Sequence, residues 1–201
     1  MQMFSLYYQL DDCVKIDKKE YPINVSFDNI LKIIDMLNDK RLASNYKTHL
    51  GLQMFFGKRT DLIDLPLKTK TEIFNQVFNE YVNQEKKEEV QTDLAGNPLP
   101  AKYKKDKENF YSLKHDAEYI YASFLQAYGI DLIEQQGKLH WFKFQALLAG
   151  LPEDTKFRQV VSIRMWKKPS KHDTEEKQML ELQEVYKLPN ESKVEEWQTE
   201  E

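Results

Sequence analysis

Glycine is scarce in this chain of 201 residues, which contains six glycines, or about 3%, against a usual proportion of roughly 7%. Loops that cradle phosphate, nucleophile elbows and dinucleotide-binding turns need glycine where the backbone approaches a ligand or takes a positive φ. The nearest match to a phosphate-binding loop, residues 51–59, is one residue too long and has Arg59 where Ser or Thr is required. We therefore expect no nucleotide site here, and instead a helix that ends at Gly57.

Cysteine, long apolar runs and excess positive charge are also lacking. The single cysteine, Cys13, cannot form a disulfide within the chain or build a thiolate metal site by itself. No apolar run approaches the roughly 18–20 residues of a membrane span, and the first residues lack the basic segment of a secretory signal. The net charge of −4 disfavours nonspecific binding to phosphates. We expect a soluble, intracellular protein with no nucleic-acid or membrane partner, no metal and no other cofactor.

Hydrophobic periodicity predicts a mainly α-helical fold with a short N-terminal β-hairpin. Strands at 14–16 and 21–23 alternate apolar and polar residues around a polar turn at 17–20. Pro22 is compatible with an edge position or a strand end. Apolar residues at helical spacing predict helices over 28–39, 43–56, 69–87, 115–128, 139–149 and 173–187, and a short helix after Asp154-Thr155.

Individual residues predict how some of these helices begin and pack. Either Ser26 or Asp28 is expected to cap the first helix, because both side chains accept hydrogen bonds from free backbone N–H groups. In the second helix, Tyr46, Leu50 and Met54 lie on one stripe. The third helix has a broad apolar face formed by Ile73, Phe74, Val77, Phe78, Tyr81 and Val82.

Composition divides the chain into a domain and a tail. Residues 1–166 are expected to form a single helical domain that is interrupted by a long flexible loop at 88–112, where turn residues at 96–100 precede a mixed charge run. Residues 167–201 contain six Lys and ten Asp or Glu. We expect this part to be a charged tail that is partly helical or disordered.

No arrangement of reactive side chains specifies catalysis. His115 and Glu118 would share a helix face as a metal-binding pair requires, but the sequence has no second such pair. The alternative is that Asp116 and Glu118 favour the first turn of a helix through its dipole. Cys13 would act as a nucleophile only with a distant His. We expect that the protein is not an enzyme, and only convergence of His115, Glu118 and His140 would revive that hypothesis.

Two aromatic helix faces are candidate partner-binding surfaces. Trp141, Phe144 and Leu148 point one way from the predicted helix 139–149, which is apolar around most of its circumference. Such a helix is either fully buried or shared with a partner, and aromatic residues at this spacing more often belong to a core. The second candidate face is on the helix at 69–87 and consists of Phe74, Phe78 and Tyr81.

Four segments in the second half of the chain, 116–126, 128–132, 139–144 and 150–157, resemble a known protein family. These segments, together with Tyr21-Pro-Ile-Asn24 and Phe27 near the start, are similar to a tail-protein family of siphophages of Gram-positive hosts. That family is encoded between the major tail protein and the tape measure protein. The likeness covers about residues 14–166 and leaves out the linker and the acidic tail.

This resemblance implies a tail-assembly chaperone rather than an enzyme. Proteins of this kind are thought to coat the long, helical, apolar tape measure protein until tube subunits polymerise around it. The implied partners are the tape measure protein, a second tail chaperone and further copies of this chain. The implied location is the host cytoplasm during assembly, with none in the mature virion. The alternative is a structural tail component that remains in the virion.

Overall fold

The computed structural model describes residues 5–10, 12–58, 60–82, 110–167 and 175–189. These residues divide into two compact units, which we describe separately. Unit 1 contains the described residues up to 82 together with 133–149, and unit 2 contains 110–132 and 150–189. Most of the predicted loop 88–112 lies outside the described residues. The expected single domain over 1–166 with a separate tail stays a prediction.

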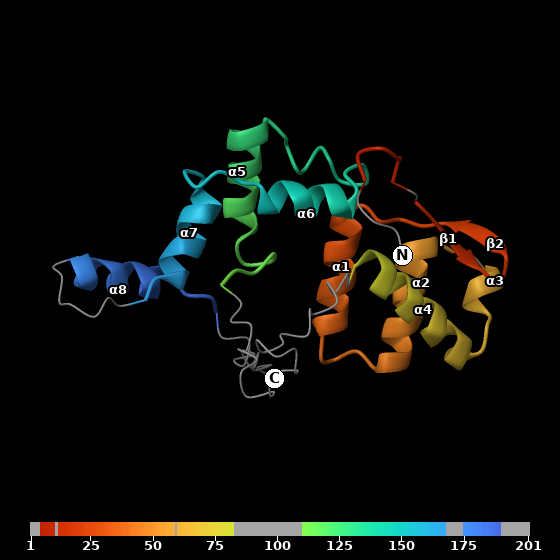
Figure 1. Cartoon of the computed structure of the whole chain (residues 1–201). Coiled ribbons are helices and arrows are strands. Elements are labelled where there is room, and N and C mark those ends of the chain that lie inside the picture. The colour runs from red at the N-terminus through yellow and green to blue at the C-terminus, as the bar shows by residue number, and fades with distance from the viewer. Residues whose placement is uncertain (1–4, 11, 59, 83–109, 168–174, 190–201) are drawn as a thin grey trace, which may run out of the picture. The chain divides into compact units, whose positions relative to one another are not determined.

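The described chain is mainly helical with one N-terminal hairpin, which confirms the predicted fold class. The predicted helices are present within a few residues, except that the one predicted over 69–87 ends at Tyr81, and residues 83–87 lie outside the described residues. A further helix of four residues was too short for periodicity to indicate. No helix in the described ranges has the length and apolar content of a membrane span. Unit 1 contains β1 (Cys13–Ile16), β2 (Lys19–Pro22), α1 (Phe27–Asn38), α2 (Ser44–Phe56), α3 (Thr60–Ile63), α4 (Leu67–Tyr81) and α6 (Trp141–Ala149) (Figure 1). Unit 2 contains α5 (Ala117–Tyr128), α7 (Lys156–Met165) and α8 (Glu175–Val185).

The hairpin closes through a tighter turn than the predicted four residues. Strands β1 and β2 pair antiparallel around Asp17 and Lys18 alone. Both turn residues have a positive φ, of 46° and 70°, as type I′ hairpin turns require. Val14 and Tyr21 face each other across the strands and are both buried. Pro22 lies at the end of β2, as expected.

The junction, which we define as residues 24–27 together with 139–141, joins two distant parts of unit 1. The first segment leads from the hairpin into α1, and the second begins α6, which lies across the N-terminal end of α1 (Figure 1). Ser26 and His140 form an isolated antiparallel bridge. Three backbone hydrogen bonds tie this region together: Asn24 N–H to Phe55 O at 2.7 Å, Trp141 N–H to Val25 O at 2.8 Å, and Phe27 N–H to Leu139 O at 2.9 Å.

Polar side chains at the start of α1 reinforce the junction. Asn29 is buried and donates to the carbonyls of Asn24 and Met54 at 2.8 and 2.9 Å. Of the two candidate caps, Ser26 occupies the N-cap position, but its hydroxyl donates to the side chain of Asn24. Asp28 instead accepts the N–H of Gly137 at 2.8 Å. Burial raises the pKa of Asp28, but its hydrogen bonds, that from Gly137 foremost, outweigh this effect and hold the pKa below its usual value.

Helix α2 packs through a different face from the predicted stripe. Its buried residues are Gly51, Leu52, Phe55 and Phe56, whereas Tyr46 is exposed and Leu50 and Met54 are only partly covered. The helix itself is present as predicted, but the stripe is not the face through which it packs. The physical reason is that the ring of Phe74 in α4 lies directly on Gly51, where a Cβ would be 2.3 Å from Phe74 Cε2.

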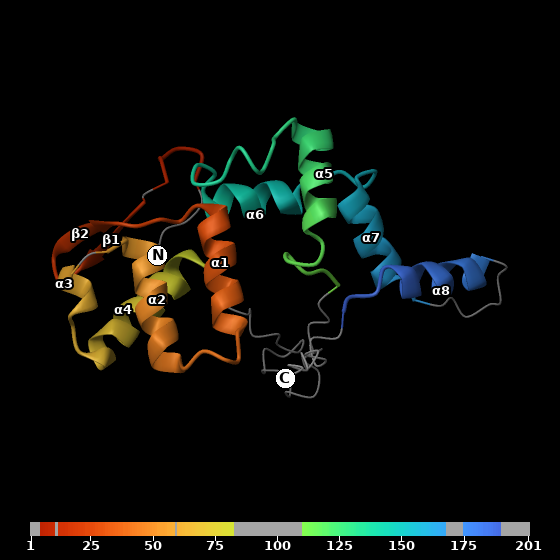
Figure 2. The same ribbon diagram turned by 180° about the vertical axis from the view of Figure 1, so that it is seen from behind.

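Unit 2 is built on the packing of α5 against α7 (Figure 2). The buried hydroxyl of Ser123 donates to Tyr119 O at 2.6 Å and accepts the N–H of Phe157 at 3.0 Å, so one side chain of α5 also satisfies the first turn of α7. Gly129 ends α5 with a left-handed φ of 64°, as predicted. Apolar side chains fill the contact: Ile120, Phe124, Phe157, Val160 and Val161 are all buried.

Gly51→Ala is expected to destabilise the protein by about 1–3 kcal/mol, because the added methyl group overpacks the contact with Phe74. Helix propensity alone predicts the opposite sign, a gain of about 1 kcal/mol. Urea denaturation followed by circular dichroism measures the change. The double variant Gly51→Ala with Phe74→Leu is expected to recover part of the loss. A single variant that unfolds at higher urea than the original chain would contradict this packing argument.

Candidate functional site

The structure buries the first candidate partner face in the core of unit 1. Trp141 and Phe144 are 3% and 2% exposed. Phe144 stacks on Phe27 of α1 with ring centroids 5.0 Å apart, and on Trp141 at 5.5 Å. Leu148 is only partly covered. The aromatic side chains of α6 are therefore part of the core of unit 1 in this conformation. Their use in partner binding stays a prediction.

The second candidate face is also largely covered. Tyr81 of α4 stacks on Phe142 of α6, with centroids 6.2 Å apart and planes 8° from parallel. Its hydroxyl donates to Cys13 O at 2.8 Å, which also ties α4 to the hairpin. Phe74 is buried and stacks on the partly covered Phe78 at 5.7 Å. Both predicted faces therefore contribute buried aromatic residues to unit 1, and the use of the second face in partner binding stays a prediction as well.

His140 has a structural role at the start of α6 that the sequence did not indicate. It is buried, and its Nδ1 accepts the N–H of Phe142 at 3.0 Å, which satisfies a free donor of the helix. Its Nε2 lies 3.4 Å from a carboxylate oxygen of Asp12. Burial, foremost, and the charge of Lys143 lower the pKa of His140, while Asp12 raises it, and the net direction is downward. The ring is therefore neutral at pH 7 and acts as a cap.

The candidate catalytic residues belong to different units. His115 and Glu118 are exposed residues of unit 2, and His140 belongs to unit 1. Cys13 is an exposed free thiol. Within the part of the chain that the structure describes, no three His, Cys, Asp or Glu side chains form a group that could hold a metal ion. The expectation that the protein is not an enzyme stays a prediction.

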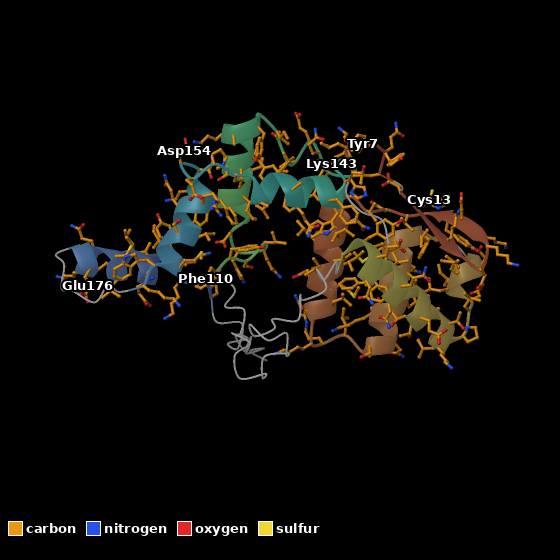
Figure 3. All side chains as sticks on the ribbon, in the orientation of Figure 1. Tyr7, Cys13, Phe110, Lys143, Asp154 and Glu176 are labelled. Carbon is orange, nitrogen blue, oxygen red and sulfur yellow. The ribbon has the colours of Figure 1, made fainter. Side chains whose placement is uncertain are left out.

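A buried ion pair organises unit 2, and its cation was missed in the sequence. Asp116 and Arg164 have side chains that are 1% and 9% exposed. The guanidinium group bonds both carboxylate oxygens, at 2.7 and 2.8 Å, and the carbonyl of Phe110 (labelled in Figure 3) at 3.0 Å. Asp116 also accepts the N–H of Ser112 at 2.9 Å. The sequence contained one signal for a buried cation: Arg164 follows Val160 and Val161 by four and three residues, so it shares a helix face with two apolar side chains.

The most exposed large apolar side chains of the described residues precede the hairpin. Leu6, Tyr7 and Tyr8 follow one another and are 92%, 93% and 81% exposed. Tyr7, labelled in Figure 3, belongs to a described segment, 5–10, that contains no charged residue. Exposed apolar groups that adjoin one another are typical of surfaces that bind other molecules. This segment is therefore the accessible candidate for binding an apolar partner.

Comparison with known proteins gives the family. The chain matches the Bacteriophage Gp15 protein family over residues 7–188 and belongs to that family. No curated protein and no solved structure matches the chain. The family match confirms the part of the resemblance that concerns bacteriophages. The place in the tail, the chaperone role and the host stay outside what the match covers.

Trp141→Ala is expected to destabilise the protein by about 3–5 kcal/mol, because it empties a buried aromatic site. Trp141→Phe should lose much less, since it keeps a stacked ring and removes an indole N–H that has no hydrogen-bond partner among the described residues. Urea denaturation of both variants measures the difference. An alanine variant that is as stable as the original chain and loses only partner binding would identify Trp141 as a contact residue instead.

Acidification is expected to destabilise the protein through His140. The unfolded side chain titrates near 6.5, and burial lowers the pKa of the folded one below that value. As the pH falls below 6.5, the unfolded state therefore binds more protons than the folded state. Above pH 6.5, the neutral His140 ring makes its full contribution to the free energy of unfolding. This contribution is lost as the pH falls below 6.5 and through the lower pKa of the folded state. Urea midpoints at about pH 7.5 and about pH 5.5 measure the effect.

Two histidine variants separate this effect from other titrations. His140→Asn keeps a side chain that can cap a helix but does not titrate in this range, so its urea midpoint should depend less on pH. His115→Asn changes an exposed histidine and should keep the original dependence. Equal pH dependence in the original chain and in His140→Asn would show that His140 is not the responsible group.

Proposed function

We propose that this chain is a phage tail-assembly chaperone that binds and solubilises the tape measure protein during tail morphogenesis. Membership of a bacteriophage protein family over residues 7–188 supports a role in a phage. The resemblance of the segments between 116 and 157 to tail proteins supports assembly of the tail. The observation that carries client binding is the run of three exposed apolar side chains at positions 6–8.

The proposed binding mode follows from the chemistry of that run. Leu6, Tyr7 and Tyr8 offer apolar area that the folded units leave uncovered, and an apolar helix is a client of matching chemistry. Charged residues make up 31% of the chain. A charged outer surface keeps a complex with an aggregation-prone client in solution. In this binding mode, the aromatic candidate residues of α4 and α6 stabilise the fold, and the fold presents residues 6–8 to the client.

The other parts of the proposal follow from the same role. The chain acts by binding rather than by catalysis, in the host cytoplasm, and leaves before the virion is complete. A second tail chaperone and further copies of the chain are the additional proposed partners. Nucleic acid, membranes and cofactors have no part in it. The alternative is a structural tail component that the virion retains.

Co-expression with the tape measure protein encoded beside it tests the proposal. The tape measure protein is expected to be soluble only when this chain is present and to co-purify with it in a complex of high mass by light scattering. Mass spectrometry of purified virions should detect none of this chain. A tape measure protein that stays insoluble, together with stoichiometric amounts of this chain in virions, would favour the structural alternative.

A matched pair of surface variants tests the proposed contact. Replacing Leu6, Tyr7 and Tyr8 by Ser removes apolar contacts of about 1.5–3 kcal/mol per side chain. The yield of co-purified client should therefore fall by at least about tenfold. The control replaces two exposed apolar residues of unit 2, Leu125 and Met165, by Ser and should keep the yield. Equal yields from both variants would place the client contact elsewhere on the chain.

A further inference from the structure

Helix α8 has little apolar contact with the rest of unit 2. None of its described positions 176–185 is buried. Leu180, Leu182 and Val185 are all exposed, the last at 74%. A helix of 11 residues is marginal in water without a docking surface. The contacts that α8 does make therefore decide where it lies.

These contacts are polar and gather at the C-terminal end of α8. The Gln183 side chain donates to the carbonyls of Ile163 and Trp166 at 2.9 and 2.8 Å. These carbonyls belong to the end of α7, where few backbone donors of the helix remain. That of Ile163 also accepts the N–H of Trp166 at 3.2 Å. Lys156 donates to the hydroxyl of Tyr186 at 2.6 Å and lies 4.6 Å from the centroid of its ring. Helix α8 is thus held by Gln183 and Tyr186.

The surface that holds α8 is maintained by other contacts. We call it the α8 receptor: Tyr119, Lys156, Arg164 and the carbonyls of Ile163 and Trp166. Arg164 uses its Nε to bond Tyr186 O, while its two terminal nitrogens bond Asp116 and Phe110 O. The ring of Tyr119 meets that of Tyr186 edge-on at 6.1 Å. The Asp116–Arg164 pair joins the start of α5 to α7, so it holds the Arg164 side chain through contacts that do not involve α8.

Charge is complementary across this contact. Residues 156–167 contain four Lys or Arg and no acidic residue, whereas α8 contains four Glu and one Lys. Attraction between such segments does not depend on whether they belong to the same chain. This attraction falls with added salt, because most charged side chains of α8 are exposed.

We infer that the receptor also takes α8 from a second copy of the chain, so that two copies associate by reciprocal exchange of this helix. Every contact described above forms equally well between copies. No position of α8 from 176 to 185 is buried, so its release costs little burial of its own side chains, and seven residues separate Lys167 from Glu175. The short connection favours docking within one chain only because it raises the effective concentration of α8 at the receptor of its own chain. Exchange therefore becomes dominant at high chain concentration, and reciprocity closes the assembly as a two-fold dimer.

The purified full chain tests this inference without any client, so its failure would leave the tail-assembly proposal untouched. Light scattering is expected to give a mass near 24.0 kDa when dilute, rising towards twice that value with concentration. Deletion of residues 169–173 prevents α8 from folding back and should give the dimer even when dilute. A deletion variant that stays at the single-chain mass at every concentration would overturn the inference.

Point variants distinguish exchange of α8 from other modes of association. Gln183→Ala with Tyr186→Ala removes the anchors and should keep the single-chain mass. Val185→Ala changes an exposed neighbour on the same helix, for which the structure gives no receptor contact, and should associate like the original chain. Circular dichroism checks that each variant is folded. Association of the anchor variant to the same extent as the original chain would overturn the proposal.

A mixing experiment shows whether the contact forms between chains. One chain carries Lys156→Ala, which weakens the receptor, and the other carries Gln183→Ala and Tyr186→Ala, which disable α8. Each alone should have the single-chain mass. Their mixture combines one intact receptor with one intact α8 and should form a pair of twice that mass. A mixture that remains at the single-chain mass would contradict exchange.

Discussion

Unit 1 depends on one short antiparallel contact, in which residues 25–27 exchange backbone hydrogen bonds with 139–141. These bonds fix where α1 and α6 begin, so that the Phe27 and Phe144 rings stack between them. The same extended segment bonds the end of α2 through Asn24. Backbone groups in a buried junction must be paired. The aromatic core therefore forms only when both distant segments are in place.

Local signals in the sequence were sufficient for most of the secondary structure. Gly57 and Gly129 have positive φ values at the ends of α2 and α5, where glycine was expected to end each helix. The hairpin follows from alternation on both sides of a polar turn. These features depend on neighbours in the chain, which one sequence contains. Helix packing depends on distant residues, and for that reason the stripe at Tyr46 did not identify the face that Phe74 covers through Gly51.

The candidate site was harder to predict than the fold because aromatic residues serve cores and interfaces with the same chemistry. The pattern on α6 could not distinguish burial of Trp141 from partner binding, and the structure buries the side chain. Arg164 has its role because it pairs with Asp116, which lies far along the chain. His140 has its role because burial excludes water from its ring. By contrast, the exposed segment at 6–8 has no periodic pattern at all. Its accessibility is a property of the folded units, which composition does not reveal.

The two units alternate along the chain, since unit 1 contains residues on both sides of α5. During synthesis from the N-terminus, α1, α2 and α4 leave the ribosome before α6, which completes their core. Until then, Phe27 lacks the stacking partner Phe144 and Tyr81 lacks Phe142. Contacts so distant in sequence form slowly and leave apolar surface uncovered in the meantime. Until about three quarters of the chain has been made, unit 1 therefore lacks the helix that covers its aromatic side chains.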